Sequence, residues 1–475
     1  MRKKRLAFLF SILLVFLLMG CSAQPKQTTQ ADNAAIRFTD DLGRNIQLEQ
    51  PCQTIISLYS AHTENLYMLG AGDSVIGVNS TAIIPADAAS KTEYGYEDPE
   101  PIIAAHPDVV LLRPFIDRKY PDFVASLENA GLTVVSLYPE RFTDFDSYIE
   151  KLGLLSGREA EAKQGLEIFH DSLLAITALT KDAKDKQTIF FESTDTNVRT
   201  VIGDSMPALA IQMAGGVNIA GDLPPISEGS SIAAFGSEKV LELAEEIDVY
   251  VSQRGSMNAG GNLHAISLRP GYKNIKAVKN GRVYEVNEKI ISSPTLNYNK
   301  GVREIARYLY PEIMDSLDAY RTDQPADRRD FANILVRYTH EPIYIPSSSS
   351  YYDTEHQGHT YGMFADIDWK NPDFDAIETA ATTGWIESEK TEGKEYFRAD
   401  TKVTREMLAR AIYLMRDYKK KDTHIAIKDL DACAVPEIVQ TLVDNGVMPL
   451  EKGKFNPNRE LTQNEILSIL QSLEK

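Results

Sequence analysis

Cysteine is scarce in this chain of 475 residues, which contains only Cys21, Cys52 and Cys433. The three lie far apart, without the close spacing of a cysteine metal site or the density of a disulfide-stapled domain. The sequence therefore argues against a disulfide framework and against a cysteine-ligated metal.

Positive charge is also in short supply. Lys and Arg number 50 against 68 Asp and Glu, which gives a formal net charge of -18. Loss of residues 1–20, which carry four positive and no negative charges, would change the net charge from -18 to -22. So acidic a chain argues against nucleic acid as the main partner, because binding to the phosphate backbone depends on basic side chains.

Catalytic and metal-binding motifs are missing as well. The chain has no Gly-x-Ser-x-Gly turn, no phosphate-binding loop and no metalloprotease pair of histidines. A bare metal ion needs several ligands converging at ~2 Å. Of the 8 histidines, only His62 falls on a loop that could face a ligand. We therefore expect neither an enzyme nor a protein with a resident metal or cofactor.

The long apolar run of the chain lies at its N-terminus. Four basic residues, 2–5, precede an apolar stretch over 6–19, which is short for a bilayer span and typical of a signal peptide. The end of this stretch and the two residues after it, Leu18-Met19-Gly20-Cys21, resemble a bacterial lipobox. The resemblance implies cleavage after residue 20 and a lipid on Cys21. A plain signal peptide or a membrane anchor is the alternative.

The polar segment 21–35 lacks periodicity and predicts a tether. Together with the lipobox, this segment predicts a lipid-anchored protein on the extracytoplasmic face of the cell membrane.

From residue 54 onward, short apolar runs alternate with helical stretches, as in an α/β fold. Strand-like runs lie at 54–60, 74–79, 108–112 and 133–137, and the same order recurs at 188–193, 217–221, 247–252 and 282–286. Helices are expected over 63–69, 100–105, 120–130, 206–214 and 238–244. The recurrence predicts that a whole lobe is duplicated.

The predicted fold class is α/β, with two Rossmann-like lobes joined by a long helix and followed by a mainly α-helical C-terminal module. We place the N-terminal lobe at 36–144, the linking helix at 145–181, with a possible break near Gly157, the C-terminal lobe at 182–320 and the module at 321–475. Ligands of such sheets bind beyond the carboxyl ends of parallel strands, which predicts a cleft between the lobes.

A family resemblance supports this layout. The stretch RFTDDLGRNIQLEQPCQTIISLYSAHTENLYMLGAGDSVIGV resembles the opening of class III solute-binding proteins, which serve ABC importers of ferric siderophores, haem and cobalamin. Further matching pieces are EPIIAAHPDVVLL, LENAGLTVVSL, GLLSGREAEA and AVKNGRVYEVNEKIISSPTLN. The resemblance covers about residues 36–315. It implies a binding protein whose partners are a permease and a bulky ligand that can itself carry iron or cobalt.

Two glutamates begin matching helices of the two halves. Glu100 leads into the run at 108–112, and Glu238 leads into the run at 247–252. The resemblance implies that both stand on the rims of the lobes and dock with arginines of the permease. The alternative is that they only favour the positive end of a helix dipole, an effect of ~0.3–1 kcal/mol each.

The loops after the strands are rich in Tyr and Arg, and several of these residues are candidates for contact with ligand. Arginine pairs with carboxylate and catecholate oxygens, so the arginines suggest an anionic ligand, while aromatic rings supply flat apolar walls. For each residue the alternative is a solvated loop position or a helix cap. The candidates are Tyr59, His62, Arg113, Phe115, Arg118, Tyr138, Arg199 and Arg254.

The C-terminal part contains two similar stretches in which Phe397 and Phe455, like Thr404 and Thr462, lie 58 residues apart. The stretches resemble S-layer homology repeats, which bind secondary polymers of the Gram-positive cell wall. Arg405 and Trp385 are the implied polymer contacts, although Trp385 and Trp369 are expected first in the core. A degenerate helical module that packs only on itself is the alternative.

Two other classes of function stay open from the sequence. One is a wall-associated structural or adhesion protein that uses the lobes as a scaffold, and the other is a surface enzyme on the same fold.

Overall fold

The structure is a computed structural model, and it describes residues 36–203, 205–221, 223–227, 230–314, 323–339, 341, 343–344, 362, 364–368, 371, 373–416 and 418–473. Cys21, the predicted signal peptide and tether, and Trp369 lie outside the described residues. Within the described part of the chain, no helix is both long enough and apolar enough to cross a membrane.

The first lobe is built around a parallel sheet of five strands in the order β5-β4-β3-β6-β7. Its strands are β3 (Ile55–Ser57), β4 (Val75–Val78), β5 (Thr92–Glu93), β6 (Val109–Leu112) and β7 (Val134–Ser136). The hairpin of β1 (Ile36–Thr39) and β2 (Asn45–Leu48) precedes it. All four residues of β6 are buried, as expected for a parallel strand covered on both faces.

The helices of this lobe are α2 (Ser60–Met68), α3 (Ala86–Ala89), α4 (Glu100–Ala105), α5 (Pro114–Lys119) and α6 (Pro121–Asn129). Prolines occupy the first turns of α4, α5 and α6, where the missing N–H costs no helical hydrogen bond. Gly131, at φ +82°, then closes α6.

The second lobe repeats the plan with the parallel order β10-β8-β12-β13. Its strands are β8 (Thr188–Glu192), β10 (Val217–Asn218), β12 (Val249–Arg254) and β13 (Val283–Asn287), with a side hairpin of β9 (Arg199–Val201) and β11 (Ile232–Ala234). The helices are α9 (Met206–Met213), α10 (Ser237–Glu242), α11 (Leu263–Leu268), α12 (Lys276–Lys279), α13 (Glu288–Ile291), α14 (Tyr298–Leu309) and α15 (Pro311–Met314). In the two strand orders, β8 and β12 are neighbours in the second sheet as β3 and β6 are in the first. The second lobe therefore repeats the arrangement of the first.

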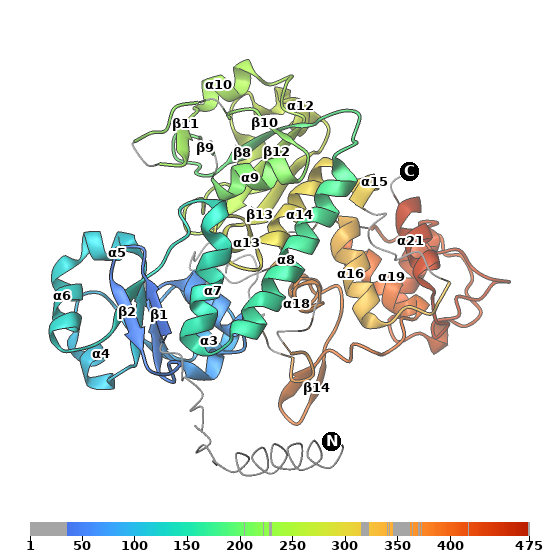
Figure 1. Cartoon of the computed structure of the whole chain (residues 1–475). Coiled ribbons are helices and arrows are strands. Elements are labelled where there is room, and N and C mark those ends of the chain that lie inside the picture. The colour runs from blue at the N-terminus through green and yellow to red at the C-terminus, as the bar shows by residue number, and fades with distance from the viewer. Residues whose placement is uncertain are drawn as a thin grey trace, which may run out of the picture.

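The link between the lobes consists of two helices, α7 (Phe145–Ser156) and α8 (Glu159–Thr180), where the sequence suggested a single helix with a possible break. The break falls at Gly157, whose φ of +68° ends α7. A side chain there would also collide with Pro51, whose Cβ would lie 2.9 Å from the new carbon. In Figure 1, α7 and α8 run side by side between the lobes. The predicted fold class is therefore confirmed, with a two-helix link.

The two lobes are also hydrogen-bonded directly to each other, at α2 of the first lobe. The Asn65 side chain donates to the carbonyl of Pro294 at 2.9 Å and accepts from the N–H of Leu296 at 3.0 Å. The Asn297 amide donates to the Glu64 carboxylate at 2.6 Å. These bonds tie α2 of the first lobe to residues 294–297 of the second.

The C-terminal module contains the helices α16 (Arg328–Thr339), α18 (Phe374–Thr382), α19 (Arg405–Met415), α20 (Pro436–Asp444) and α21 (Gln463–Ser472), with a hairpin of β14 (Glu389–Thr391) and β15 (Lys394–Tyr396). The segments that precede α16, α19 and α21 pair with one another in a ring, through the bridges Pro325–Thr462, Asp327–Lys402 and Thr404–Glu460. The repeated sequence thus forms a three-part helical arrangement with its own apolar core.

Candidate functional site

The carboxyl edge of the first sheet carries a compact cluster of one arginine and three aromatic rings. Tyr59 follows β3, Arg113 follows β6 and Tyr138 follows β7, so parallel strands bring them to the same edge. The Arg113 guanidinium carbon lies 4.8 Å from the ring centre of Tyr59 and 5.0 Å from that of Phe115. The rings of Tyr59 and Tyr138 are 6.2 Å apart. We call these four residues the Arg113 cluster.

The chemistry of the Arg113 cluster is that of a flat apolar surface with one fixed positive charge. Phe115 is 45% exposed, which is unusual for a phenylalanine and leaves a face of its ring open to solvent. Burial raises the pKa of the phenols of Tyr59 and Tyr138, so both stay neutral at ordinary pH. The rings of Tyr59 and Phe115 hold the Arg113 guanidinium in place by cation–π attraction. Such a surface suits a large flat ligand with an anionic or electron-rich group.

His62, which the sequence placed among the ligand contacts, lies inside the first lobe with no exposed surface. One ring nitrogen, Nδ1, lies 2.8 Å from the hydroxyl of Tyr148, and the other, Nε2, lies 2.8 Å from the carbonyl oxygen of Leu112. A neutral ring with its proton on Nε2 satisfies both contacts, because Nε2–H donates to Leu112 and Nδ1 accepts from Tyr148. His62 is therefore a structural residue in the interior of the first lobe. The prediction that it contacts ligand is wrong, because its side chain has no exposed surface.

Arg254 is likewise an interior residue, 1% exposed at the end of β12. Its Nε lies 3.0 Å from a carboxylate oxygen of Glu285, and it donates to the carbonyl of Ala259 at 3.0 Å. It therefore anchors the loop 255–262 and does not face the side on which ligand is expected.

Arg199 and Arg118 keep accessible side chains, at the start of β9 and in the last turn of α5. The structure does not bring them into the Arg113 cluster.

The second lobe exposes two apolar side chains, on and just after the loop that follows β12, that the sequence analysis did not single out. Met257, on the loop after β12, is 49% exposed, and Leu263, at the start of α11, is also exposed. The Glu288 carboxylate holds this loop by accepting from Ser256 Oγ at 3.1 Å. In the sequence, only the position of this loop directly after a strand could have marked Met257 as a candidate for ligand contact, because a single methionine in a loop belongs to no recognisable motif.

Glu100 and Glu238 occupy the first turns of α4 and α10, and both are exposed. These helices lead into β6 and β12, which hold corresponding places in the two sheets. In α4 the capping role falls to Asp98, whose carboxylate accepts from the N–H of Glu100 at 3.0 Å. Neither glutamate side chain has an ion-pair partner among the described residues. In Figure 1, α4 and α10 lie at the far ends of the two lobes.

A metal site is not found in the part of the chain that the structure describes. No group of three or more His, Cys, Asp or Glu side chains there is arranged to hold a metal ion. Cys52 and Cys433, which are both buried, are free thiols.

Arg405 is buried within the module, contrary to an exposed polymer-binding role. It donates to the carbonyls of Phe455 and Pro449, each at 2.8 Å, and its guanidinium stacks on the Phe455 ring at 5.1 Å. Arg328 makes the equivalent bond to the carbonyl of Phe397, at 2.7 Å. Both arginines therefore join one repeat to the next. Trp385 is also buried, in the apolar core of the module.

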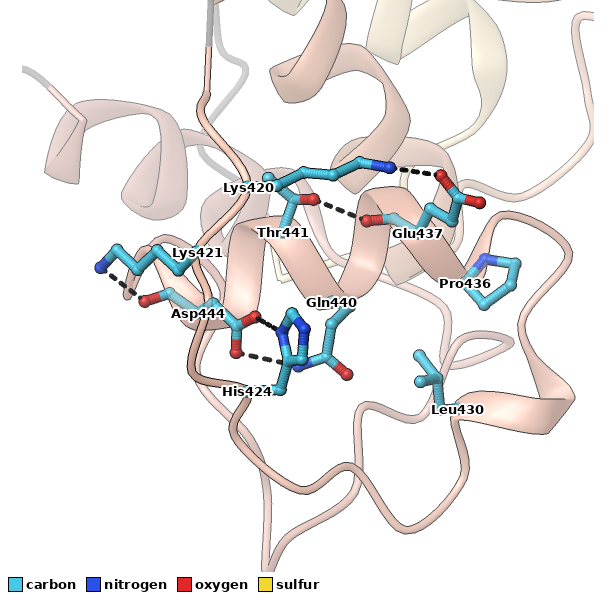
Figure 2. A pocket seen from close by; sticks show the side chains of 9 residues that line it. All are labelled: Lys420, Lys421, His424, Leu430, Pro436, Glu437, Gln440, Thr441 and Asp444. Carbon is cyan, nitrogen blue, oxygen red and sulfur yellow. Dashed lines mark hydrogen bonds and ion pairs between the residues drawn. The ribbon is translucent and has the colours of Figure 1, made fainter.

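A pocket of about 280 Å³ opens beside α20 in the module. Figure 2 shows its wall of charged and polar side chains, Lys420, Lys421, His424, Glu437, Gln440 and Asp444 among them. The Asp444 carboxylate lies 2.7 Å from His424 Nδ1, and the Lys420 ammonium lies 2.7 Å from the Glu437 carboxylate. The pocket thus combines two lysines and a histidine with two carboxylates, and Lys421, which donates to the backbone carbonyl of Asp444 at 2.8 Å, is the lysine of this wall without an ion-pair partner among the described residues.

Comparison with known proteins gives a family match for the two lobes. Residues 55–290 match the family model described as periplasmic binding protein. An uncharacterized ABC transporter substrate-binding lipoprotein of Bacillus subtilis, YvrC, is 25% identical over 65% of this chain and 98% of its own length. A vitamin B12-binding protein of Vibrio campbellii is 25% identical over 54% of this chain and 90% of its own length.

Among solved structures, a periplasmic solute binding protein of Veillonella parvula aligns with a TM-score of 0.50 at 17% identity, over 67% of this chain and 95% of its own. That likeness supports the two-lobed α/β fold. All three proteins are named as binding proteins, and none is named as an enzyme.

Proposed function

From the match of residues 55–290 to the periplasmic binding protein family, we propose that the chain is the lipid-anchored solute-binding protein of an ABC importer. It captures a bulky metal chelate, a corrinoid, haem or ferric siderophore, between the carboxyl edges of its two sheets and delivers it to the permease. The observation that carries the proposal is the Arg113 cluster, which presents exposed aromatic surface and a fixed cation at the edge where α/β sheets bind ligands.

The proposed capture involves no chemistry on the ligand. The rings of Tyr59, Phe115 and Tyr138 cover one face of the chelate, Arg113 pairs with a polar group at its rim, and Met257 and Leu263 approach from the second lobe. Asn65 joins the lobes by hydrogen bonds, and the proposed closure is a small rotation. A corrinoid is the first ligand to test, since several relatives are named vitamin B12-binding or cobalamin-binding proteins. Iron or cobalt arrives inside the ligand.

Removal of the Arg113 cluster should weaken ligand binding. We expect Arg113→Ala and Phe115→Ala each to lower the affinity of the mature chain by about tenfold, since each removes a contact of ~1–2 kcal/mol. Tyrosine fluorescence quenching or calorimetry with cyanocobalamin, haemin and a ferric hydroxamate, in parallel, measures the effect and identifies the ligand. Arg158→Ala, which removes an exposed arginine of the link, is the matched control. Wild-type affinity in both cluster variants would contradict the proposed site.

We propose in addition that the module holds the protein against an anionic cell-wall polymer through the pocket beside α20. This second role is favoured by Lys421, whose ammonium bonds to a backbone carbonyl, whereas Lys420 and His424 are paired with carboxylates of the same wall. The double change Lys420→Glu/Lys421→Glu should reduce co-sedimentation of the mature chain with purified wall sacculi by at least about fivefold. Lys394→Glu/Lys402→Glu, elsewhere on the module, is the charge-matched control. Equal sedimentation of the two double variants would exclude the pocket.

A further inference from the structure

A cavity of about 710 Å³ lies where the two lobes, their link and the C-terminal module meet. Its walls come from Met68 and Pro85 of the first lobe, Ser172 of α8, the face of α14 from Asn299 to Arg307, and α16 and α18 of the module. In Figure 1, α8, α14, α16 and α18 converge in this region. The volume is in the range of ~300–1,000 Å³ that small-molecule sites occupy. No residue of the Arg113 cluster lines it.

Much of the charge in the cavity wall is neutralised within the wall. Lys300 pairs with Asp375, and Arg307 pairs with Glu304 at 2.6 Å. Asp373 lies 3.7 Å from Arg329, which stands outside the cavity wall. Burial raises the pKa of the Glu64 carboxyl, which favours its neutral form. Arg303 and Arg337 also line the cavity, so its four cationic side chains face three carboxylates besides the neutral Glu64. The net charge of the wall is therefore small, which suits a neutral ligand.

Three asparagines of the cavity wall, Asn297, Asn299 and Asn333, have side-chain oxygens that can still accept hydrogen bonds. The Oδ1 atom of Asn299 is buried and accepts no hydrogen bond from the residues that the structure describes. Asn297 and Asn333 donate through their amide nitrogens, to Glu64 at 2.6 Å and to Asp373 at 3.0 Å, and their amide oxygens accept no bond from the described residues. A buried acceptor without a partner is costly, so a ligand donor that bonds to Asn299 Oδ1 would relieve that cost, and the oxygens of Asn297 and Asn333 could accept further bonds from the same ligand.

Apolar surface lies beside these amides. Met68, Ile84, Pro85 and Val336 line the same cavity. A wall that combines amide oxygens with aliphatic carbon complements a molecule whose edge carries hydroxyl groups and whose faces carry C–H bonds.

We propose that this cavity is a second small-molecule site, for a neutral polyhydroxylated ligand of the size of a mono- or disaccharide. Ligand hydroxyls donate to the oxygens of Asn297, Asn299 and Asn333, and a ring face lies against Met68 and Pro85. The site is separate from the proposed chelate site, so a ligand can bind there whether or not the first proposal holds.

The test is calorimetric titration of the mature full-length chain with glucose, N-acetylglucosamine and myo-inositol, each up to about 10 mM, beside glucose 6-phosphate and glucosamine as charged counterparts. We expect saturable binding of at least one neutral compound. Asn299→Leu should weaken it about tenfold or more, and the melting temperature of this variant should not fall, since the Asn299 side chain makes no hydrogen bond to the described residues. Ser172→Phe, which fills the cavity from α8, should abolish binding.

The proposal is overturned by any of three results. No saturable binding of the neutral compounds, preferential binding of either charged counterpart, or neutral-compound affinity unchanged in both variants would each exclude the site. Arg113→Ala serves as the control, because it alters the first site alone and should leave sugar affinity at the wild-type value.

Discussion

Reversal of Glu100 and Glu238 to lysine in the same chain should abolish ligand uptake by cells while the purified protein keeps its wild-type ligand affinity. Each glutamate is exposed and without an ion-pair partner among the described residues, so neither change removes a contact that stabilises its lobe. A permease surface that offers arginines would meet two repulsive charges in place of two attractive ones. Like charges facing each other across an interface cost several kcal/mol, enough to prevent docking.

Uptake of radiolabelled ligand in cells that carry only the variant gene measures the effect, and calorimetry on the purified variant measures affinity. The matched control is Glu159→Lys/Glu167→Lys, which makes the same change of net charge on exposed positions of α8. If the Glu100/Glu238 variant transports as well as this control, the glutamates act only on their helix dipoles. Each single reversal should give a partial loss, since one charge pair remains.

The case for this pair comes from the correspondence of the two lobes. Each glutamate lies in the first turn of a short helix, Glu100 in α4 and Glu238 in α10. The helix α4 leads into β6, which pairs with β3, and α10 leads into β12, which pairs with the corresponding strand β8. In α4 the free N–H of Glu100 is already satisfied by Asp98, so capping does not explain the glutamate. Two equivalent charges at the far ends of a duplicated protein are well placed to set the orientation of a two-sided partner.

Local signals in the sequence predicted most of the repeating elements. The helix expected over 100–105 is α4, with the same bounds, because prolines at its start and a left-handed His106 at its end fix its length. The buried run at 109–112 is β6, because four consecutive apolar residues suit a parallel strand covered on both faces. The hairpin of β1 and β2 went unpredicted, since its turn is held by Asp40, whose carboxylate accepts from the N–H groups of Leu42 and Arg44.

The candidate site was predicted less well, because sequence places a residue at a strand end without giving the direction of its side chain. Tyr59, Arg113 and Tyr138 turn outward and meet at one edge. His62 turns inward because its partner Tyr148, which lies 86 residues away, completes its hydrogen bonding. Arg254 is held inside by Glu285, and Arg405 by the carbonyls of the next repeat. In each case a distant partner decides the direction, and no local pattern reports it.

His62 should make the protein less stable as the pH falls from 6.5 to 4. Burial without exposed surface lowers the pKa of its imidazole from 6.5 to about 4, so between these values the unfolded chain binds a proton that the folded chain does not. Protonation therefore stabilises the unfolded state relative to the folded state as the pH falls, and the free energy of unfolding decreases. A difference of this size in pKa corresponds to a loss on the order of 3 kcal/mol in the free energy of unfolding.

The change His62→Gln isolates this effect. A glutamine amide can donate to the carbonyl of Leu112 and accept from Tyr148, as the neutral imidazole does, but it does not titrate. Other groups, such as Glu64, titrate equally in both proteins, so the difference between the two unfolding curves reports His62 alone. Urea unfolding at a series of pH values should show the wild type losing about 3 kcal/mol more than the variant between pH 6.5 and 4, with the gap closing above pH 6.5. Parallel curves over that range would mean that His62 is protonated in the folded state, and then Tyr148 could not be its hydrogen-bond donor.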